Sequence, residues 1–357
     1  MKNSKQNLKA ELTYVKDLYI GIDVHKNKWV VTVRSYNLEL HTFSMSEATA
    51  EKLHEHLKNS YPHQTYHLVY EAGFSGYGLY DYFHAQGIDI IVTPPNRLPK
   101  DGSRVKTDRT DSRKLAFLLS RGELKRVCVP DKEIREYRSV VKIHDSTKKE
   151  LKRISQRIKS LLHFYGHPLA RHKMNMKLVK QLREIEFNTE ELTYAFKNLL
   201  DQYEFYVQRL KETKKLVVSL SKKERISHEV KKIDKVKGIG TAGAVKIVVK
   251  LFDTVERFPT SGGVTHYVGI TPSEHSSGSK ERKGGITHIG DREFRAFIIQ
   301  IAWNVVRYDP ALTEKFESVY SRTHSKNKAI VAVARKLLVR LYTIIKKDEA
   351  YMPGLLI

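Results

Sequence analysis

The chain has 357 residues and a large excess of basic side chains. Its 64 Lys and Arg outnumber its 40 Asp and Glu, which gives a formal net charge of +24 at pH 7. A charge of this size indicates a nucleic-acid partner. The single cysteine, Cys128, excludes an internal disulfide and any Cys-x-x-Cys metal site. Because neither a signal peptide nor an apolar run of the ~20 residues of a membrane span is present, we expect a cytoplasmic protein with no membrane partner.

The N-terminal part of the chain predicts a mixed sheet with helices on its faces. After a basic tail (residues 1–17), β-branched and aromatic runs predict strands at 19–24, 29–35, 38–43, 67–70 and 88–93. Helices are predicted around residues 46–59, 76–86 and 107–121. This order combines hairpins with crossover connections. We therefore assign residues 18–132 to one α/β domain.

A helical pattern begins near residue 133. Apolar residues recur at spacings of three and four in two stripes: Leu151, Ile154, Ile158 and Leu161, then Leu192, Phe196, Leu199, Tyr203, Tyr206 and Leu210. The stripes predict long helices that pair as an antiparallel hairpin or as a coiled coil between protomers, with a break at 166–168 near the turn. Ordinary core-facing helices are an equal alternative. We assign residues 133–228 to a helical coiled-coil arm.

The third region, residues 229–357, is predicted to be mainly helical. The stretch "VKGIGTAGAVKIVV" predicts a tight turn that enters a helix. Its Lys237, Gly238 and Gly240 either hold a DNA phosphate, as in a helix-hairpin-helix motif, or simply link two elements. The stretch "GITPSEHSSGSKERKGGITHIGD" is a polar loop too long for a simple connector. Helices with basic faces are expected at 292–306 and 326–347.

Four acidic residues stand out in this basic chain. Asp23 lies in the apolar run "YIGIDVH", where an ionised carboxylate needs a partner. Glu71 follows the 67–70 strand directly, so pairing of that strand with the first would bring both acids to one sheet end. Asp108 and Asp111 are spaced i to i+3 and share a helix face. Each acid alone is explained as a strand-end or helix-start residue, but together they favour a site for Mg²⁺ or Mn²⁺.

A run of basic residues surrounds the last two acids. It contains Arg97, Lys100, Arg104, Lys106, Arg109 and Arg113. A solvated face is the usual explanation of such a run. The net charge of +24 instead favours contacts with a phosphate backbone.

These motifs resemble those of the IS-one-ten family of insertion-sequence transposases. The stretches "GIDVHK", "YEAGFSGYGLYDYF", "PPNRLPK" and "KTDRTDSRKLA" resemble its RuvC-like DEDD domain. The stretches "VKGIGTAGAVKIV" and "FPTSGGVTHYVGITPSEHSSGSKERKGGITHIGDREFR" resemble its C-terminal transposase domain. The resemblance covers residues 17 to 345. It implies a RuvC/RNase H-like mixed sheet in residues 18–132 and a transposase domain in residues 229–357.

The resemblance also implies roles for individual residues in DNA cleavage and strand exchange. Asp23, Glu71, Asp108 and Asp111 match the metal-binding acids of the family. Ser277, which Gly278 follows, matches the serine that is taken to form a covalent phosphoserine link to DNA. The neighbouring Lys280, Arg282 and Lys283 would bind the DNA backbone, and Ser273, Ser276 and Ser279 are alternative nucleophiles.

The resemblance further implies a noncoding guide RNA that pairs with donor and target DNA. Because strand exchange between two duplexes needs several cleavage events, we expect a homodimer that assembles to a tetramer on nucleic acid, at the nucleoid of a prokaryotic cell. One alternative is a RuvC-like nuclease that cuts branched DNA with water and does not need Ser277. A sugar-kinase or actin-like ATPase would need a second phosphate loop, and an inert DNA- or RNA-binding protein would have no use for four clustered acids.

Overall fold

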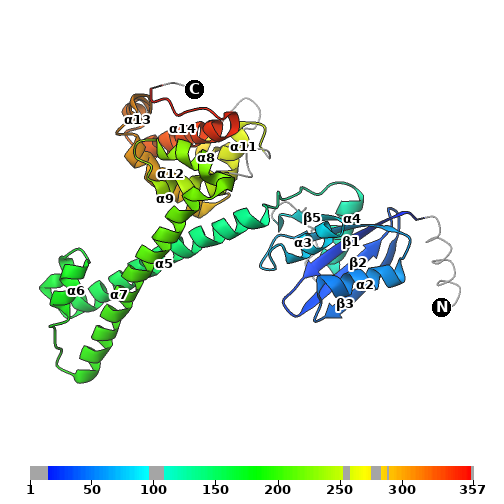
Figure 1. Cartoon of the computed structure of the whole chain (residues 1–357), viewed down its shortest axis with the longest axis horizontal. Coiled ribbons are helices and arrows are strands. Elements are labelled where there is room, and N and C mark those ends of the chain that lie inside the picture. The colour runs from blue at the N-terminus through cyan, green and yellow to red at the C-terminus, as the bar shows by residue number, and fades with distance from the viewer. Residues whose placement is uncertain (1–14, 96–107, 252–257, 275–282, 288, 355–357) are drawn as a thin grey trace. The chain divides into compact units, whose positions relative to one another are not determined.

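The computed structural model describes residues 15–95, 108–251, 258–274, 283–287 and 289–354 (Figure 1). The chain divides into two compact units, Met1–Val129 and Pro130–Ile357. Buried apolar residues form separate clusters in the two units, so each unit has its own hydrophobic core. Within the described ranges, no helix combines the length and the apolar character needed to cross a bilayer.

A five-stranded mixed sheet forms the centre of the first unit (Figure 1). Its strands are β1 (Asp17–Val24), β2 (Lys28–Arg34), β3 (Glu39–Ser46), β4 (Thr65–Glu71) and β5 (Asp89–Thr93). Their order across the sheet is β3-β2-β1-β4-β5. The first three strands pair antiparallel, whereas β4 is parallel to β1 and β5 is parallel to β4. The mixed sheet predicted from the sequence is therefore confirmed.

Helices cover both faces of this sheet. They are α2 (Ala50–Ser60), α3 (Gly78–Ala85) and α4 (Asp108–Ser120). On one face Ile20 of β1 shares a buried cluster with Leu53 of α2 and Phe83 of α3. On the other face Val69 of β4 is clustered with Leu115 of α4. Because successive side chains of a strand point to opposite faces, the central strands are buried on both sides.

Helix α4 packs directly on the backbone of β1 at Gly21. A Cβ atom on Gly21 would lie 2.2 Å from the carbonyl oxygen of Ser112 and 2.5 Å from the amide nitrogen of Ala116. The buried hydroxyl groups of Thr32 and Ser112 are 2.9 Å apart and join β2 to the same helix. Only glycine permits so close an approach between a strand and a helix.

Two long helices, α5 (Lys132–Phe164) and α7 (Glu190–Ser219), pair within the second unit (Figure 1). Val141 of α5 and Val217 of α7 belong to one buried cluster, whereas Ile158 and Leu200 belong to another. The start of α5 therefore lies beside the end of α7, and the two helices are antiparallel within one chain. A pairing between protomers stays a prediction.

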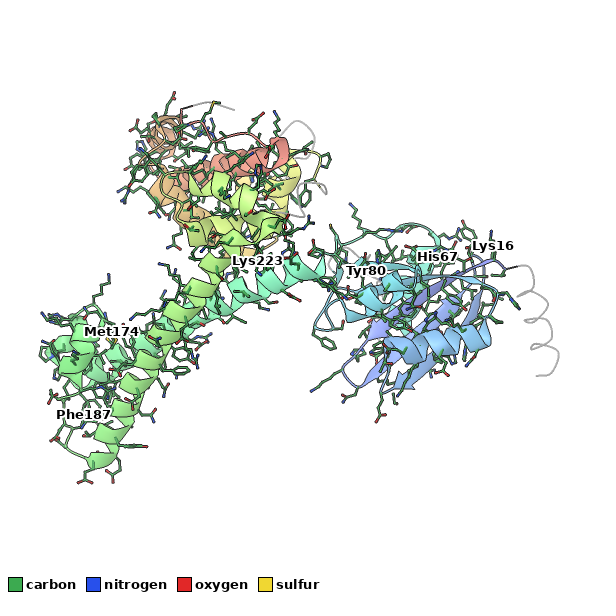
Figure 2. The ribbon with its side chains drawn as sticks, viewed as in Figure 1. Lys16, His67, Tyr80, Met174, Phe187 and Lys223 are labelled. Atoms are coloured by element: carbon green, nitrogen blue, oxygen red, sulfur yellow. The ribbon has the colours of Figure 1, made fainter. Side chains whose placement is uncertain are left out.

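The connection between α5 and α7 has structure of its own. Gly166, with a φ of +68°, follows the end of α5. The 3₁₀ helix η2 (Pro168–Arg171) and helix α6 (Met176–Leu182) come next. Met174 and Phe187, labelled in Figure 2, flank α6 and pack on the buried cluster around Phe196. The break predicted at 166–168 thus begins a small helical cap rather than a single turn.

The C-terminal part of the second unit is mainly helical, as predicted. Its helices are α8 (Glu224–Asp234), α9 (Thr241–Leu251), α11 (Ser261–Val268), α12 (Arg292–Val305), α13 (Pro310–Thr323) and α14 (Lys326–Lys347). They enclose a core that contains Val248, Ile298 and Leu337. Strands β6 (Pro272–Glu274) and β7 (Lys283–Ile286) form an antiparallel hairpin beside them. The two short strands enclose residues 275–282, which lie outside the described ranges.

Candidate active site

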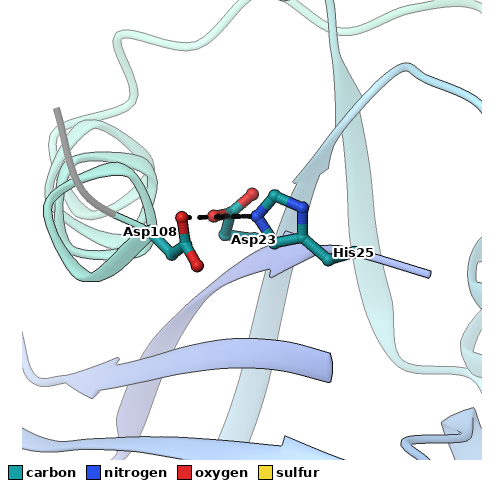
Figure 3. A group of neighbouring side chains, drawn as sticks. All are labelled: Asp23, His25 and Asp108. Atoms are coloured by element: carbon teal, nitrogen blue, oxygen red, sulfur yellow. Dashed lines mark hydrogen bonds and ion pairs between the residues drawn. The ribbon is translucent and has the colours of Figure 1, made fainter. Parts of the chain in front are cut away.

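Two carboxylates and one imidazole meet where β1 ends and α4 begins (Figure 3). Nε2 of His25 lies 3.0 Å from Oδ2 of Asp23 and 3.5 Å from Oδ1 of Asp108. One ligand atom from each of the three residues lies within 4.8 Å of the other two. The close contact of α4 with Gly21 brings the helix start to the end of the strand, and so brings these side chains together.

The electrostatic surroundings of Asp23 are unfavourable for its charge. Burial raises the pKa of its carboxyl group, and the neighbouring charges of Asp108 and Asp111 raise it further, while His25 lowers it. Only 20% of the Asp23 side chain is exposed, so water screens this repulsion poorly. A cation among these residues would relieve the repulsion.

Glu71 and Asp111 lie next to this group. Ile22 of β1 pairs with Tyr70 of β4 in parallel register, so Asp23 and Glu71 follow that pair at the same end of the sheet. Asp111 is in the first turn of α4 together with Asp108. Both side chains are partly buried. The backbone therefore places Asp23 and Glu71 at one end of the sheet, whereas the group of converging ligand atoms contains neither Glu71 nor Asp111, and their role as ligands stays a prediction.

His25 was not predicted as a site residue. It comes directly after β1 and lies two positions beyond Asp23 in the "GIDVHK" stretch. Residues two apart along a strand point to the same face, so this spacing was the available signal. Its Nε2 lies close to both carboxylates and is the third possible donor atom of the group.

The donor set fits a divalent metal ion. Carboxylate oxygens are the preferred ligands of Mg²⁺ and Mn²⁺, and an imidazole nitrogen suits transition metals. Asp23, Asp108 and His25 provide these donors within a short distance of one another. Burial, and after it the charges of Asp108 and Asp111, raise the pKa of Asp23, and a bound cation would favour its charged form.

The basic residues predicted around the acids are described only in part. Arg109 and Arg113 are exposed on α4, and Nε of Arg113 donates a hydrogen bond of 2.9 Å to Glu39 on β3. Arg113 is therefore partly neutralised within its own unit. Arg97, Lys100, Arg104 and Lys106 lie outside the described residues.

The predicted nucleophile also lies outside the described residues. Ser277, Lys280 and Arg282 belong to the segment between β6 and β7, and so do the alternatives Ser276 and Ser279. Lys283 is the first residue of β7, but its side chain is not described. Ser273 is described, and its hydroxyl donates a 3.0 Å hydrogen bond to the carbonyl oxygen of Gly285 across the hairpin. This bond gives Ser273 a structural role.

The glycine turn lies between α8 and α9. Gly238 has a φ of +96°, and a Cβ atom there would lie 3.0 Å from the amide nitrogen of Val305 in α12. Packing on α12 therefore explains this glycine. Gly240 is exposed with open space around it, and Lys237 is exposed beside it. These two residues remain accessible to a phosphate.

Two family models match the chain in sequence order. A DEDD-type model of IS110 elements, described as "Transposase", matches residues 20–167. A second model, described as "Transposase IS116/IS110/IS902 family", matches residues 230–317. The first match contains all four predicted acids, and the second contains the glycine turn and the β6–β7 hairpin.

Proteins that are similar to this chain over most of its length are also named transposases. "Putative transposase y4qE" of Sinorhizobium fredii is 27% identical over 306 residues, which cover 84% of this chain and 74% of the relative. "Transposase for insertion sequence element IS1111A" of Coxiella burnetii is 24% identical over 293 residues, covering 80% and 79%. A solved structure, the large terminase nuclease from thermophilic phage G20c, has a TM-score of 0.20 at 22% identity, covering 33% of this chain and 60% of the phage chain.

These matches identify the class of protein as an enzyme that acts on DNA, a transposase. More specifically, the chain belongs to the IS110/IS116/IS902 family of insertion-sequence transposases.

Proposed function

We propose that this transposase cleaves and rejoins DNA strands through a covalent phosphoserine intermediate. In this proposal Asp23, Glu71, Asp108 and Asp111 hold a divalent metal ion, and Ser277 is the nucleophile. The observation that carries the metal site is the approach of Asp23 and Asp108 to a common nitrogen of His25. The role of Ser277 rests on its place in the family motif "HSSGSK".

The carboxylates are suited to hold Mg²⁺, with Mn²⁺ as the alternative. Such an ion, when bound, would neutralise charge on a DNA phosphate and lower the pKa of an attacking hydroxyl group. The chain contributes the placement of the ligands. Gly21 and the hydroxyl contact between Thr32 and Ser112 hold α4 against the sheet, so Asp108 stays near Asp23.

The serine step conserves the energy of the phosphodiester bond. Oγ of Ser277 attacks the phosphorus atom and loses its proton, a P–O bond to Ser277 forms, and the P–O bond to one deoxyribose oxygen breaks. That oxygen leaves as a hydroxyl group once it accepts a proton. A hydroxyl group of another strand can then attack the phosphoserine, which restores a phosphodiester and frees Ser277 without an external energy source.

The basic residues would position the nucleic acid. One group lies near the acids along the chain and contains Arg97, Lys100, Arg104, Lys106, Arg109 and Arg113. A second group lies near the serine and contains Lys280, Arg282 and Lys283. At the turn before α9, Lys237 and Gly240, on either side of Gly238, would form a further phosphate site. The net charge of +24 supports these assignments.

The assembly is part of the same proposal. Donor and target duplexes are bound by a homodimer that becomes a tetramer on nucleic acid, and a noncoding RNA of the element selects the DNA by base pairing. The reaction takes place at the nucleoid in the cytoplasm of a prokaryotic cell. Basic side chains that bind phosphates do not read the DNA sequence, so base pairing with the RNA would supply the sequence specificity.

A labelled-DNA experiment tests the chemistry. Wild-type protein, Ser277→Ala and the neighbouring control Ser276→Ala are incubated with Mg²⁺ and end-labelled donor DNA, together with the RNA transcribed from the element. Denaturing gels should show a protein–DNA adduct for wild type and Ser276→Ala, and none for Ser277→Ala. Asp108→Asn should also abolish the adduct while the affinity for DNA stays close to wild type.

Other outcomes would point elsewhere. An adduct that persists in Ser277→Ala but not in Ser276→Ala would move the nucleophile to the neighbouring serine. Strand cleavage without any adduct would favour the RuvC-like nuclease that uses water. Full activity of Asp108→Asn would remove the metal-site assignment.

A further inference from the structure

A groove of about 960 Å³ opens in the second unit between α13, α14 and the β6–β7 hairpin. Its floor is apolar and consists mainly of Ile270, Ile286, Val319, Val331 and Val339. Its rim is basic and contains Lys315, Arg322, Lys328, Arg335 and Lys336. No acidic side chain lines the groove within the part of the chain that the structure describes. The groove therefore combines apolar contact area with a strong positive charge.

The helix spacing explains this combination. On α13 the lining residues Lys315, Val319 and Arg322 are four and three positions apart, so they share one face of the helix. On α14 Lys328 and Arg335 are seven positions apart, so they too share a face, which also carries lining apolar residues. Two helices thus present mixed basic and apolar faces to the same space.

The rim cations lack protein partners. Among the described residues, none of the five basic side chains of the rim forms an ion pair or a side-chain hydrogen bond. The pKa of Lys336 is lowered, first by burial and then by the nearby charges of Arg340 and Lys315. The charge of Lys315 therefore opposes that of Lys336, and an anion in the groove would relieve this repulsion.

We propose that this groove binds a DNA strand, with phosphates on the basic rim and an unstacked base on the apolar floor. The proposal rests on the proposed function, because β6 and β7 lead directly into the segment that contains Ser277. A strand held there would be close along the chain to the predicted nucleophile.

The chemistry favours a single strand over a duplex. In a duplex the bases are stacked and paired inside, so only phosphates would reach the groove and the apolar floor would stay unused. A single strand can turn a base out and place its face on apolar side chains, while its flanking phosphates contact cations. The volume of the groove lies within the range of ordinary small-ligand sites, which is sufficient for a nucleotide.

The rim is tested by salt-dependent binding. The full chain is titrated with a fluorescently labelled DNA single strand at several salt concentrations. Lys328→Gln and Arg335→Gln should each reduce the slope of log K against log salt by about 0.7, the value for one lost phosphate contact in a single strand. Lys326→Gln is the matched control, because Lys326 is an exposed lysine at the start of the same helix but does not line the groove.

The floor is tested with 2-aminopurine, a fluorescent base that brightens when it is unstacked. Wild-type protein should increase the fluorescence of a single strand that carries it. Ala332→Leu, which fills the floor without changing a charge, should abolish this increase while the salt slope stays at the wild-type value. Thermal unfolding of each variant confirms that it is folded.

Several results would overturn the proposal. One is that Lys326→Gln and Lys328→Gln reduce the salt slope equally. Another is that a duplex or an RNA strand binds more tightly than the DNA strand. A third is that Ala332→Leu leaves the brightening of 2-aminopurine unchanged. Weaker self-association in the rim variants would instead assign the groove to a second copy of the chain. The proposed function is judged separately, because Ser277→Ala should keep the groove signals and lose only the adduct.

Discussion

Gly21 is the residue on which the geometry of the candidate active site most depends. It carries no catalytic group, but it lets the backbone of α4 approach β1 so closely that a Cβ atom would lie 2.2 Å from the carbonyl oxygen of Ser112. Asp108 is only one turn of helix before Ser112. Any displacement of α4 at Gly21 therefore also separates Asp108 from Asp23.

We expect Gly21→Ala to destabilise the first unit and to weaken metal binding. The added methyl group must push two backbones apart, and overpacking of this kind costs about 1–3 kcal/mol. Because the ligands are then misplaced, we expect the affinity for Mn²⁺ to fall about 10-fold or more. Chemical denaturation measures the first effect and calorimetric Mn²⁺ titration the second.

Gly78→Ala is the matched control for this prediction. Gly78 starts α3, and a Cβ atom there meets nothing within 4 Å. Gly78→Ala should therefore leave both the stability of the first unit and the affinity for Mn²⁺ near the wild-type values. Wild-type Mn²⁺ affinity in Gly21→Ala would show that the α4 contact does not position the ligands.

The site residues differ in how far the sequence could reveal them. The four acids are separated by up to 88 positions along the chain (23 to 111), and only a motif or a strand-pairing argument connects them. His25 is adjacent to that motif, yet a lone histidine after a strand gives no sign of its partner Asp108. The close packing at Gly21 depends on a tertiary contact, so no local pattern predicts it.

At the scale of elements, a buried ion pair joins α13 to α14. Oδ2 of Asp309 lies 2.7 Å from Nη1 of Arg340, and the two side chains are only 1% and 3% exposed. Asp309 also caps α13 by accepting a hydrogen bond from the N–H of Leu312, and Tyr351 donates to the same carboxylate. This contact holds together the two helices that line the groove.

We expect Asp309→Asn to destabilise the second unit by about 3–5 kcal/mol. Asparagine keeps the helix cap, but it leaves the buried guanidinium of Arg340 without a counter-charge. Asp131→Asn is the matched control, because Asp131 also caps a helix, α5, but its partner Arg225 is exposed. That change should cost less than about 1 kcal/mol. Equal costs for both variants in urea denaturation would contradict the role of burial.

The same pair predicts a pH dependence. Burial of Asp309 opposes its charge, but the hydrogen bond from Tyr351 and the charge of Arg340 outweigh burial and lower its pKa. A carboxyl group with a lowered folded-state pKa stabilises the protein above its unfolded-state pKa of about 3.9. This contribution is lost as the pH falls through the folded-state value, and Asp309→Asn should remove it.

Element boundaries show where local patterns end. A helix was predicted from residue 46, but β3 extends to Ser46 and α2 begins only at Ala50. The side chain of Thr49 accepts a hydrogen bond from the N–H of Lys52, which starts the helix there. Composition predicts that a strand and a helix meet in this region, whereas a single capping contact decides at which residue the helix begins.

At the scale of the whole molecule, the two units have separate cores and different chemistry. The candidate metal ligands all belong to Met1–Val129, and the groove and the glycine turn belong to Pro130–Ile357. Two separate cores can unfold in separate steps. A ligand then stabilises only the unit that binds it. Metal addition therefore distinguishes the units within the intact chain.

We expect Mg²⁺ or Mn²⁺ to shift one of two calorimetric transitions. At a metal concentration 100 times the dissociation constant, the first unit should gain about 2.7 kcal/mol, while the transition of the second unit stays in place. Asp108→Asn should abolish this shift, whereas Glu55→Gln, which removes an exposed acid on α2 of the same unit, should preserve it. A shift of both transitions, or of the second alone, would place the metal elsewhere in the chain. A shift that survives in Asp108→Asn would leave the metal in the first unit but remove the start of α4 from its site.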